Sequence, residues 1–316
     1  MPRFRALALA ALVVLSLASC ATVRSRVSGD PLAALGTCAA LGTCAVPGSG
    51  AAPDEPGGDG IHDALFVVIP VRKNEALVTL VGTRLSGKPG DARLAKRLDA
   101  LYVAVSASGQ AARGARFVAT GSIPKSGASL FLTERKGWTR RAEAGFSWYR
   151  SGPLSVAIPA SGVACGVFAR SLPGVTVTDG EAMVPFLRAF AAREGASPPV
   201  SRSFADYAAR ALDDGRVGFY ASDPAPFMAA LLGPEVTLPV KTVEGYAVTD
   251  GEGEYAMSLS FTLSDRRSAR ALKGLLSRAF AGSTVLEDEA RVRVEGFALS
   301  REKLALAIDF LYLVSE

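Results

Sequence analysis

The first twenty residues divide this chain into a leader and the part that can fold. They read MPRFRALALAALVVLSLASC, in which Arg3 and Arg5 form a positive head and Ala6–Leu17 is an apolar run. A helix that spans the hydrocarbon core needs about 20 apolar residues, so this run is too short to be one. The layout predicts a secretory signal peptide over residues 1–19, and the chain that folds therefore begins at Cys20.

The leader closes with Leu17-Ala18-Ser19-Cys20. These four residues resemble the lipobox of bacterial lipoprotein precursors, although an ordinary leader with a chance cysteine is the alternative. The resemblance implies that the Cys20 thiol is diacylated and that the mature protein is held to the membrane by diacylglycerol and palmitate. Ala21, and not Asp, follows the cysteine, which by the enterobacterial-type sorting rule implies the outer membrane of a diderm host. We therefore expect a lipid-anchored protein on the periplasmic face of the cell envelope.

Residues 20–60 form a segment of Ala, Gly, Pro, Ser and Thr that ends in almost pure turn residues. Such a composition cannot bury enough apolar surface to offset the entropy of ordering, so it predicts a flexible linker. A tandem duplication in the linker contains Cys38 and Cys44. A local disulfide between them is one interpretation, and drift in an unconstrained segment, which we favour, is the other.

The rest of the chain has the composition of a globular body. Hydrophobic residues make up 49% of the sequence and charged residues 21%, which is enough apolar material for a core. The formal net charge of +5 is spread over the whole length, without the concentrated basic stripe that nucleic acid requires. Since no second apolar run approaches the length of a membrane span, the sequence predicts a folded body on a lipid tether.

Short strand and helix patterns alternate along the body and predict an α+β fold. Runs rich in β-branched residues, mostly paired as hairpins, predict strands at 64–71, 101–106, 115–123, 146–150, 154–158, 163–169, 216–221, 240–248, 254–263, 284–286 and 291–298. Amphipathic periodicity predicts helices at 74–85, 91–98, 126–136, 181–193, 204–212, 224–232 and 266–280, and a last helix that Ser300 opens. The segment 74–85 also suits a strand.

The order strand, helix, hairpin, helix, hairpin occurs twice, over residues 61–195 and 200–316. Tyr102 of the first half corresponds to Tyr246 of the second at a nearly constant offset. We interpret the order as an internal repeat of two similar halves, each a small, mainly antiparallel sheet covered by helices. The alternative is the strand–helix alternation that any α+β protein shows.

The sequence contains partial matches to nucleotide-binding and metal-binding motifs, but each match lacks a residue that the motif needs. Gly82–Lys88 fits the first seven positions of a P-loop, but Pro89 stands where a hydroxyl should bind magnesium. His62 is the only histidine, and no cysteine pair has the spacing of a zinc site. Glu287-Asp288-Glu289 lacks the ladder of a calcium loop and predicts a solvated hairpin turn. We expect no metal and no cofactor.

Two segments fit the S-x-x-K pattern of penicillin-interacting enzymes, Ser122–Lys125 and Ser300–Lys303. The S-D-N element is missing, Val243 replaces the glycine of K-T-G, and Pro124 disrupts the turn that would aim the lysine. Ser300 is more simply a helix N-cap. The pattern is therefore a weak indication of an enzyme.

Basic residues surround an aromatic one at Arg135, Lys136, Trp138, Arg140 and Arg141. One interpretation is contact with anionic headgroups or a glycan. The other, which we favour, is a helix C-terminus followed by a solvated loop.

With no convincing catalytic constellation, the sequence favours a non-catalytic role as a membrane-tethered binding or structural protein of the envelope. Cys20 is the only site residue, and the expected partners are the membrane and an envelope protein or ligand, without nucleic acid. Two alternatives stay open. One is an envelope-acting hydrolase that uses an S-x-x-K serine or paired carboxylates, and the other is a solute-binding lipoprotein.

Overall fold

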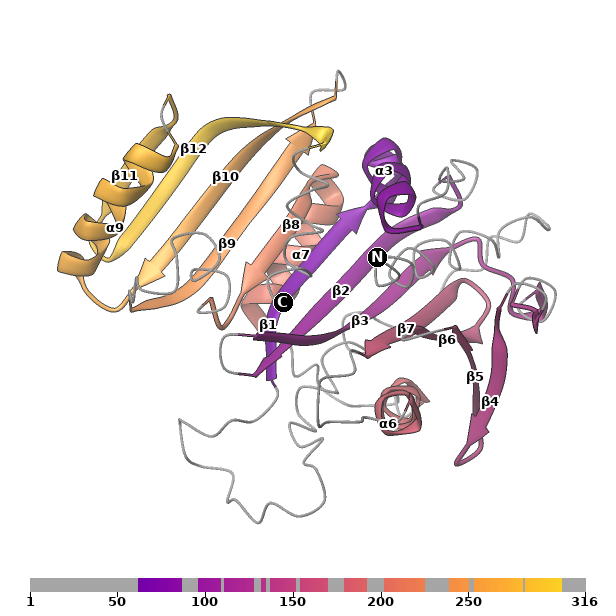
Figure 1. Ribbon diagram of the computed structural model, residues 1–316. Coiled ribbons are helices and arrows are strands. Elements are labelled where there is room, and N and C mark those ends of the chain that lie inside the picture. The colour runs from indigo at the N-terminus through magenta and orange to yellow at the C-terminus, as the bar shows by residue number, and fades with distance from the viewer. Residues whose placement is uncertain are drawn as a thin grey trace, which may run out of the picture.

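Twelve strands form one antiparallel sheet in the computed structural model (Figure 1). The structure describes residues 62–86, 96–108, 111–127, 132–134, 137–151, 154–169, 179–191, 202–224, 239–249, 253–280 and 282–302. The predicted signal peptide and the linker with its cysteines lie outside these residues, as do nearly all of the predicted helix 224–232 and all but the first two residues of the helix after Ser300.

The strands of the two sequence halves occupy opposite sides of this sheet. The first half contributes β1 (His62–Pro70), β2 (Leu98–Ser108), β3 (Ala111–Gly121), β4 (Thr139–Glu143), β5 (Phe146–Ser151), β6 (Leu154–Ala160) and β7 (Val163–Ala169). The second contributes β8 (Val217–Ala221), β9 (Val240–Thr249), β10 (Glu254–Leu263), β11 (Thr284–Asp288) and β12 (Arg291–Ser300). The order across the sheet is β11-β12-β10-β9-β8-β1-β2-β3-β7-β6-β5-β4.

Pairing of β1 with β8 joins the two sides. Leu65 lies opposite Ala221 and Val68 opposite Gly218. The antiparallel hairpins were predicted correctly, but the expectation of two small sheets is corrected to one continuous sheet. The apolar run of β1 explains the junction, because a strand in the middle of a sheet that is covered on both faces must be apolar on both.

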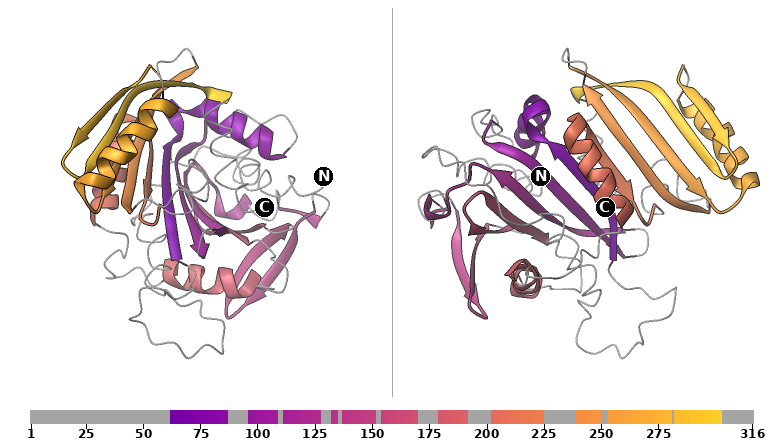
Figure 2. Two further views of the ribbon diagram at one scale, coloured as in Figure 1. Left: turned by 60° about the vertical axis from the view of Figure 1, so that its left-hand side comes forward. Right: turned by 180° about the vertical axis from the view of Figure 1, so that it is seen from behind.

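Helices cover each face of the sheet (Figure 2). On one face, which we call the α9 face, α3 (Glu75–Ser86) and α9 (Arg266–Ala279) contribute Leu77 and Leu272 to a core that includes Phe261. On the other, the α7 face, α6 (Asp179–Ala191) and α7 (Arg202–Asp214) pack on a second core that includes Val68 and Tyr102. Within the described residues, no helix combines the length and apolarity needed to cross a membrane.

Strands β10 and β12 are apolar on the α9 face only. Phe261 and Val292 are fully buried there. The neighbours in sequence, Ser260 and Arg293, point to the α7 face, since side chains alternate along a strand. This half of the α7 face is therefore polar, and α7 lies at its border.

Several predicted elements are confirmed, with shifted bounds. The segment 74–85 is helical, as α3, and the hairpin 240–263 is β9 and β10. Asp265 is the N-cap of α9, where its carboxylate accepts from the backbone N–H of Ser268 at 2.8 Å. These segments combine a strong periodicity with local stop and start signals.

Three local predictions were wrong. Leu98 begins β2 instead of ending a helix, and the described parts of 126–136 hold no α-helix, only 3₁₀ residues at Lys125–Gly127 and Glu134. Arg140 and Arg141 lie in β4 and not in a loop. Every residue of this edge strand is exposed, so it carries no apolar alternation that a sequence reading could detect.

The alternative interpretation of a basic patch around an exposed aromatic ring is not supported at Trp138. Trp138 is only 3% exposed and belongs to the core of the α9 face. Its position indicates a packing role for the ring, while Arg135 and Lys136 lie outside the described residues.

Candidate ligand-binding groove

The first S-x-x-K segment, Ser122–Lys125, forms no site in the described residues, and Lys303 of the second segment lies outside them. Lys125 is exposed, and no hydrogen bond joins its side chain to that of Ser122 in the described residues. Lys241 lies on β9, exposed, and His62 is the first residue of β1. Cys20 lies outside the described residues.

The acidic turn between β11 and β12 has intramolecular partners. Glu287, 13% exposed, lies 3.9–4.0 Å from the side-chain nitrogens of Arg266, Arg270 and Lys273 on α9. This carboxylate is thus surrounded by cations instead of being solvated as predicted. Nowhere in the described ranges do three or more His, Cys, Asp or Glu residues gather in a way that would hold a metal.

A polar groove of about 360 Å³ lies on the α7 face, between α7 and strands β9, β10 and β12. Its volume is within the ~300–1,000 Å³ range of small-molecule sites. The α7 side contributes three charged side chains, Arg210, Asp214 and Arg216. The sheet contributes four, Glu244, Arg291, Arg293 and Glu295.

Two rows of side chains cross the floor of the groove. One row is Tyr246, Ser258 and Glu295, and the next is Glu244, Ser260 and Arg293. Neighbouring strands lie ~4.8 Å apart, so each serine is flanked by two long polar side chains. The Ser260 hydroxyl is buried and has no hydrogen-bond partner. An unsatisfied buried hydroxyl costs stability, and a ligand that bonds to it would remove that cost.

Gly218 allows α7 to form the wall of this groove. A Cβ at this position would lie 2.7 Å from the ring of Tyr207 and 3.0 Å from the Cβ of Ala211. Only glycine lets the helix approach β8 this closely.

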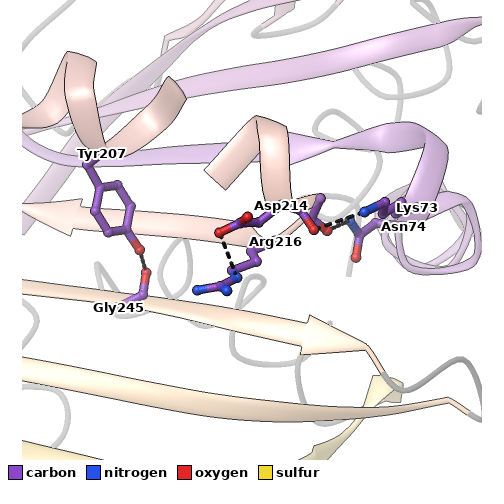
Figure 3. Close-up of polar contacts among 7 residues, drawn as sticks. Lys73, Asn74, Tyr207, Asp214, Arg216 and Gly245 are labelled. Atoms are coloured by element: carbon purple, nitrogen blue, oxygen red, sulfur yellow. Dashed lines mark hydrogen bonds and ion pairs between the residues drawn. The ribbon is translucent and has the colours of Figure 1, made fainter. Parts of the chain in front are cut away.

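Tyr207 attaches the wall to the floor (Figure 3). Its hydroxyl donates to the backbone carbonyl of Gly245 on β9. Burial raises the Tyr207 pKa far above its ordinary value, chiefly by desolvation. The phenol therefore remains a neutral donor at any pH at which the envelope functions.

The C-terminal end of α7 is held by the segment between β1 and α3 (Figure 3). The Lys73 ammonium donates to the backbone carbonyl of Asp214 at 3.0 Å. The Asn74 amide donates to the carbonyls of Pro70 at 2.8 Å and Gly215 at 3.3 Å. These bonds tie the wall of the groove to the first half of the chain.

Arg216 is held in place by two contacts. Its Nε lies 3.1 Å from a carboxylate oxygen of Asp214, and its guanidinium lies 4.8 Å from the ring centroid of Tyr246. The first contact neutralises both charges, and the second covers one face of the aromatic ring. Arg216 and Asp214 therefore shape the groove more than they present free charge.

The other charged residues of the groove are available to a ligand. Within the described part of the chain, none of them forms an ion pair: Arg210, Arg291, Arg293, Glu244 and Glu295. Sequence reasoning missed this site. The sequence signal that could have found it is the alternation of apolar and polar residues in β10 and β12. This alternation places polar side chains on the face away from the core, where no predicted element covers them.

Comparisons with known proteins place the chain in a family. Three crystal forms of TP0453 are similar in fold: form I has a TM-score of 0.64 at 21% identity, over 91% of this chain and 99% of that one. Form III has a TM-score of 0.66 at 23% identity, over 90% and 100%. Form IV has a TM-score of 0.60 at 21% identity, over 89% and 97%. No curated protein sequence matches the chain significantly. Residues 59–305 match the family described as "Outer membrane-associated lipoprotein TP0453", and the chain therefore belongs to this family of outer membrane-associated lipoproteins.

Proposed function

We propose that this lipoprotein is anchored through Cys20 and acts, without catalysis, as a binding protein of the outer envelope, with the polar groove as its ligand site. The observation that carries the proposal is the groove itself. It gathers charges of both signs that form no ion pair within the described residues, around a buried hydroxyl that has no hydrogen-bond partner there. Convergent polar groups in a concave site are the usual mark of ligand binding.

The geometry of the groove favours binding over hydrolysis. The two serines of the floor have no histidine beside them, because the only histidine is on β1.

We also propose that the halves 61–195 and 200–316 descend from one ancestral unit. The outward strand order supports this: β1, β2, β3 and then β7 on one side, and β8, β9, β10 and then β12 on the other. In each half the last strand of the chain pairs with the third. Tyr102 and Tyr246 lie in one row, through Val68 and Gly218.

The anchor is tested by replacing Cys20 with alanine. We expect the variant to accumulate with its leader or to leave the membrane fraction, because the acceptor of the lipid is missing. Detergent-phase partitioning and intact mass measure both effects. Cys44→Ala is the matched control and should partition as the wild type does. If Cys20→Ala stays fully in the detergent phase with an unchanged mass, the anchor at this residue is wrong.

The groove is tested by arginine footprinting. The full-length protein, solubilised in detergent, is treated with phenylglyoxal in the presence and absence of a water-soluble extract of the envelope. We expect the extract to slow modification of Arg291 and Arg293 at least threefold. Arg267, exposed on α9 at the opposite face, is the internal control. Equal rates at all three residues would contradict a ligand site in the groove.

A further inference from the structure

The lining of the groove also indicates which class of ligand it binds. This step rests on the proposed function, because it names the ligand of the same site. We propose that the groove binds a saccharide that carries an anionic group, either a carboxylate or a phosphate. The argument proceeds from the backbone of the floor, to its side chains, to the balance of charge.

The backbone of the floor is not available to a ligand. Strand β9 pairs with β8 and β10, β10 pairs with β9 and β12, and β12 pairs with β10 and β11. A peptide that binds by adding a strand needs an open sheet edge. Recognition in this groove therefore falls to side chains.

The side chains of the floor require a ligand that both donates and accepts. Glu244 and Glu295 are acceptors only, Arg293 is a donor only, and the Ser260 hydroxyl does both. Sugar hydroxyls also do both, so the hydroxyls of a saccharide can satisfy all of these groups. An inorganic anion or an acidic peptide would satisfy the arginines but leave the two carboxylates facing negative charge.

The excess of positive charge in the groove indicates that the ligand also carries an anionic group. Among the described residues, three guanidiniums without an ion pair, Arg210, Arg291 and Arg293, oppose two carboxylates without one, Glu244 and Glu295. Arg291 and Arg293 are two residues apart on β12 and point to the same face, ~7 Å from each other. Guanidinium is the side chain best suited to paired hydrogen bonds with carboxylate or phosphate oxygens. The anionic group therefore lies over β12, and the hydroxyls lie over β10 and β9.

The experiment measures binding to the full-length protein, solubilised in detergent, by calorimetry. The two expected ligands are tetragalacturonate, which carries carboxylates, and mannose 6-phosphate. The comparison probes are N-acetylglucosamine tetramer, tetraglutamate and inorganic phosphate. We expect at least one acidic sugar to bind at least tenfold more tightly than every comparison probe. The sugar that binds distinguishes a carboxylate source from a phosphate source.

Variants assign that binding to the groove. Arg293→Ala should weaken saccharide binding at least tenfold. Ser260→Ala should weaken it severalfold without lowering the melting temperature. Arg267→Ala on the α9 face should have no effect. The inference is overturned if tetraglutamate, phosphate or the neutral tetramer binds as tightly as the acidic sugars, if none of the sugars binds, or if Arg293→Ala binds normally. Footprint protection by the envelope extract combined with any of these results would leave the groove a ligand site and reject only the saccharide.

Discussion

Asn74→Ala is expected to lower the free energy of unfolding by about 3 kcal/mol, although Asn74 does not line the groove. Asn74 is 2% exposed. Its amide donates to the carbonyls of Pro70 and Gly215, and its side-chain oxygen accepts from the Tyr255 hydroxyl at 3.2 Å. Alanine removes the hydrogen bonds of Asn74 to these three groups. Each buried group left unsatisfied costs roughly 1–3 kcal/mol, a cost that is partly relieved by water and, for Tyr255, by its bond with Arg301.

Differential scanning calorimetry measures the change. For a body of this size each kcal/mol corresponds to about 2–4 °C, so the melting temperature should fall by roughly 6–12 °C. Two variants separate the contributions. Asn74→Asp keeps the acceptor for Tyr255 but loses the donors. Tyr255→Phe removes the hydroxyl that bonds to Asn74 and to Arg301, and it should cost less than Asn74→Ala because both amide bonds remain. A fall of under 2 °C for Asn74→Ala would contradict this account.

The same residue shows why the groove depends on the whole chain. Asn74 belongs to the first half, Gly215 follows α7, and Tyr255 is on β10. Hydrogen exchange at the C-terminal turn of α7 should therefore speed up in Asn74→Ala. The wall of the groove is positioned by contacts more than a hundred residues apart in sequence, which no local pattern reports.

The elements that were predicted correctly are those with a clear local sequence pattern, such as a helix cap or an apolar periodicity. The helix at 266–280 has an N-cap, an apolar stripe and a basic surface, and all are present in α9. Strand β4 was missed because Thr139–Glu143 is polar on both sides, as exposed edge strands often are. The helix assigned to 91–98 was wrong at Leu98, where pairing with Gly121 of β3 and burial in the core of the α9 face outweigh the local helical preference.

The arrangement of the elements was harder to predict from the sequence than the elements themselves. The pairing of β1 with β8 joins residues about 150 apart, and register between distant strands is set by burial and not by local propensity. The groove is formed by that arrangement and could not be predicted without it. Ser258, Ser260, Arg293 and Glu295 each alternate with a buried apolar residue, so their common face could be predicted, but their position beside α7 could not.

Because the two halves share one sheet, we expect a destabilising substitution in one half to lower the stability of the other half as well. Phe261 is fully buried in β10, and its replacement by alanine should cost about 3–5 kcal/mol through lost burial and the cavity that remains. Both tryptophans of the chain, Trp138 and Trp148, lie in the first half. Trp138 nevertheless belongs to the same buried cluster as Phe261. Tryptophan fluorescence therefore reports from one half on a substitution made in the other.

In Phe261→Ala we expect the urea midpoint followed by tryptophan fluorescence to fall together with the midpoint followed by far-ultraviolet circular dichroism, because one hydrophobic cluster spans the β1–β8 junction. Leu275→Ala, in the same half but 37% exposed on α9, is the matched control and should shift both midpoints little. If the halves were independent folding units, the fluorescence midpoint would stay at its wild-type value while the dichroism split into two transitions. Coincident shifts instead require that the four residue pairs between β1 and β8, with the core beneath them, transmit the loss across the whole sheet.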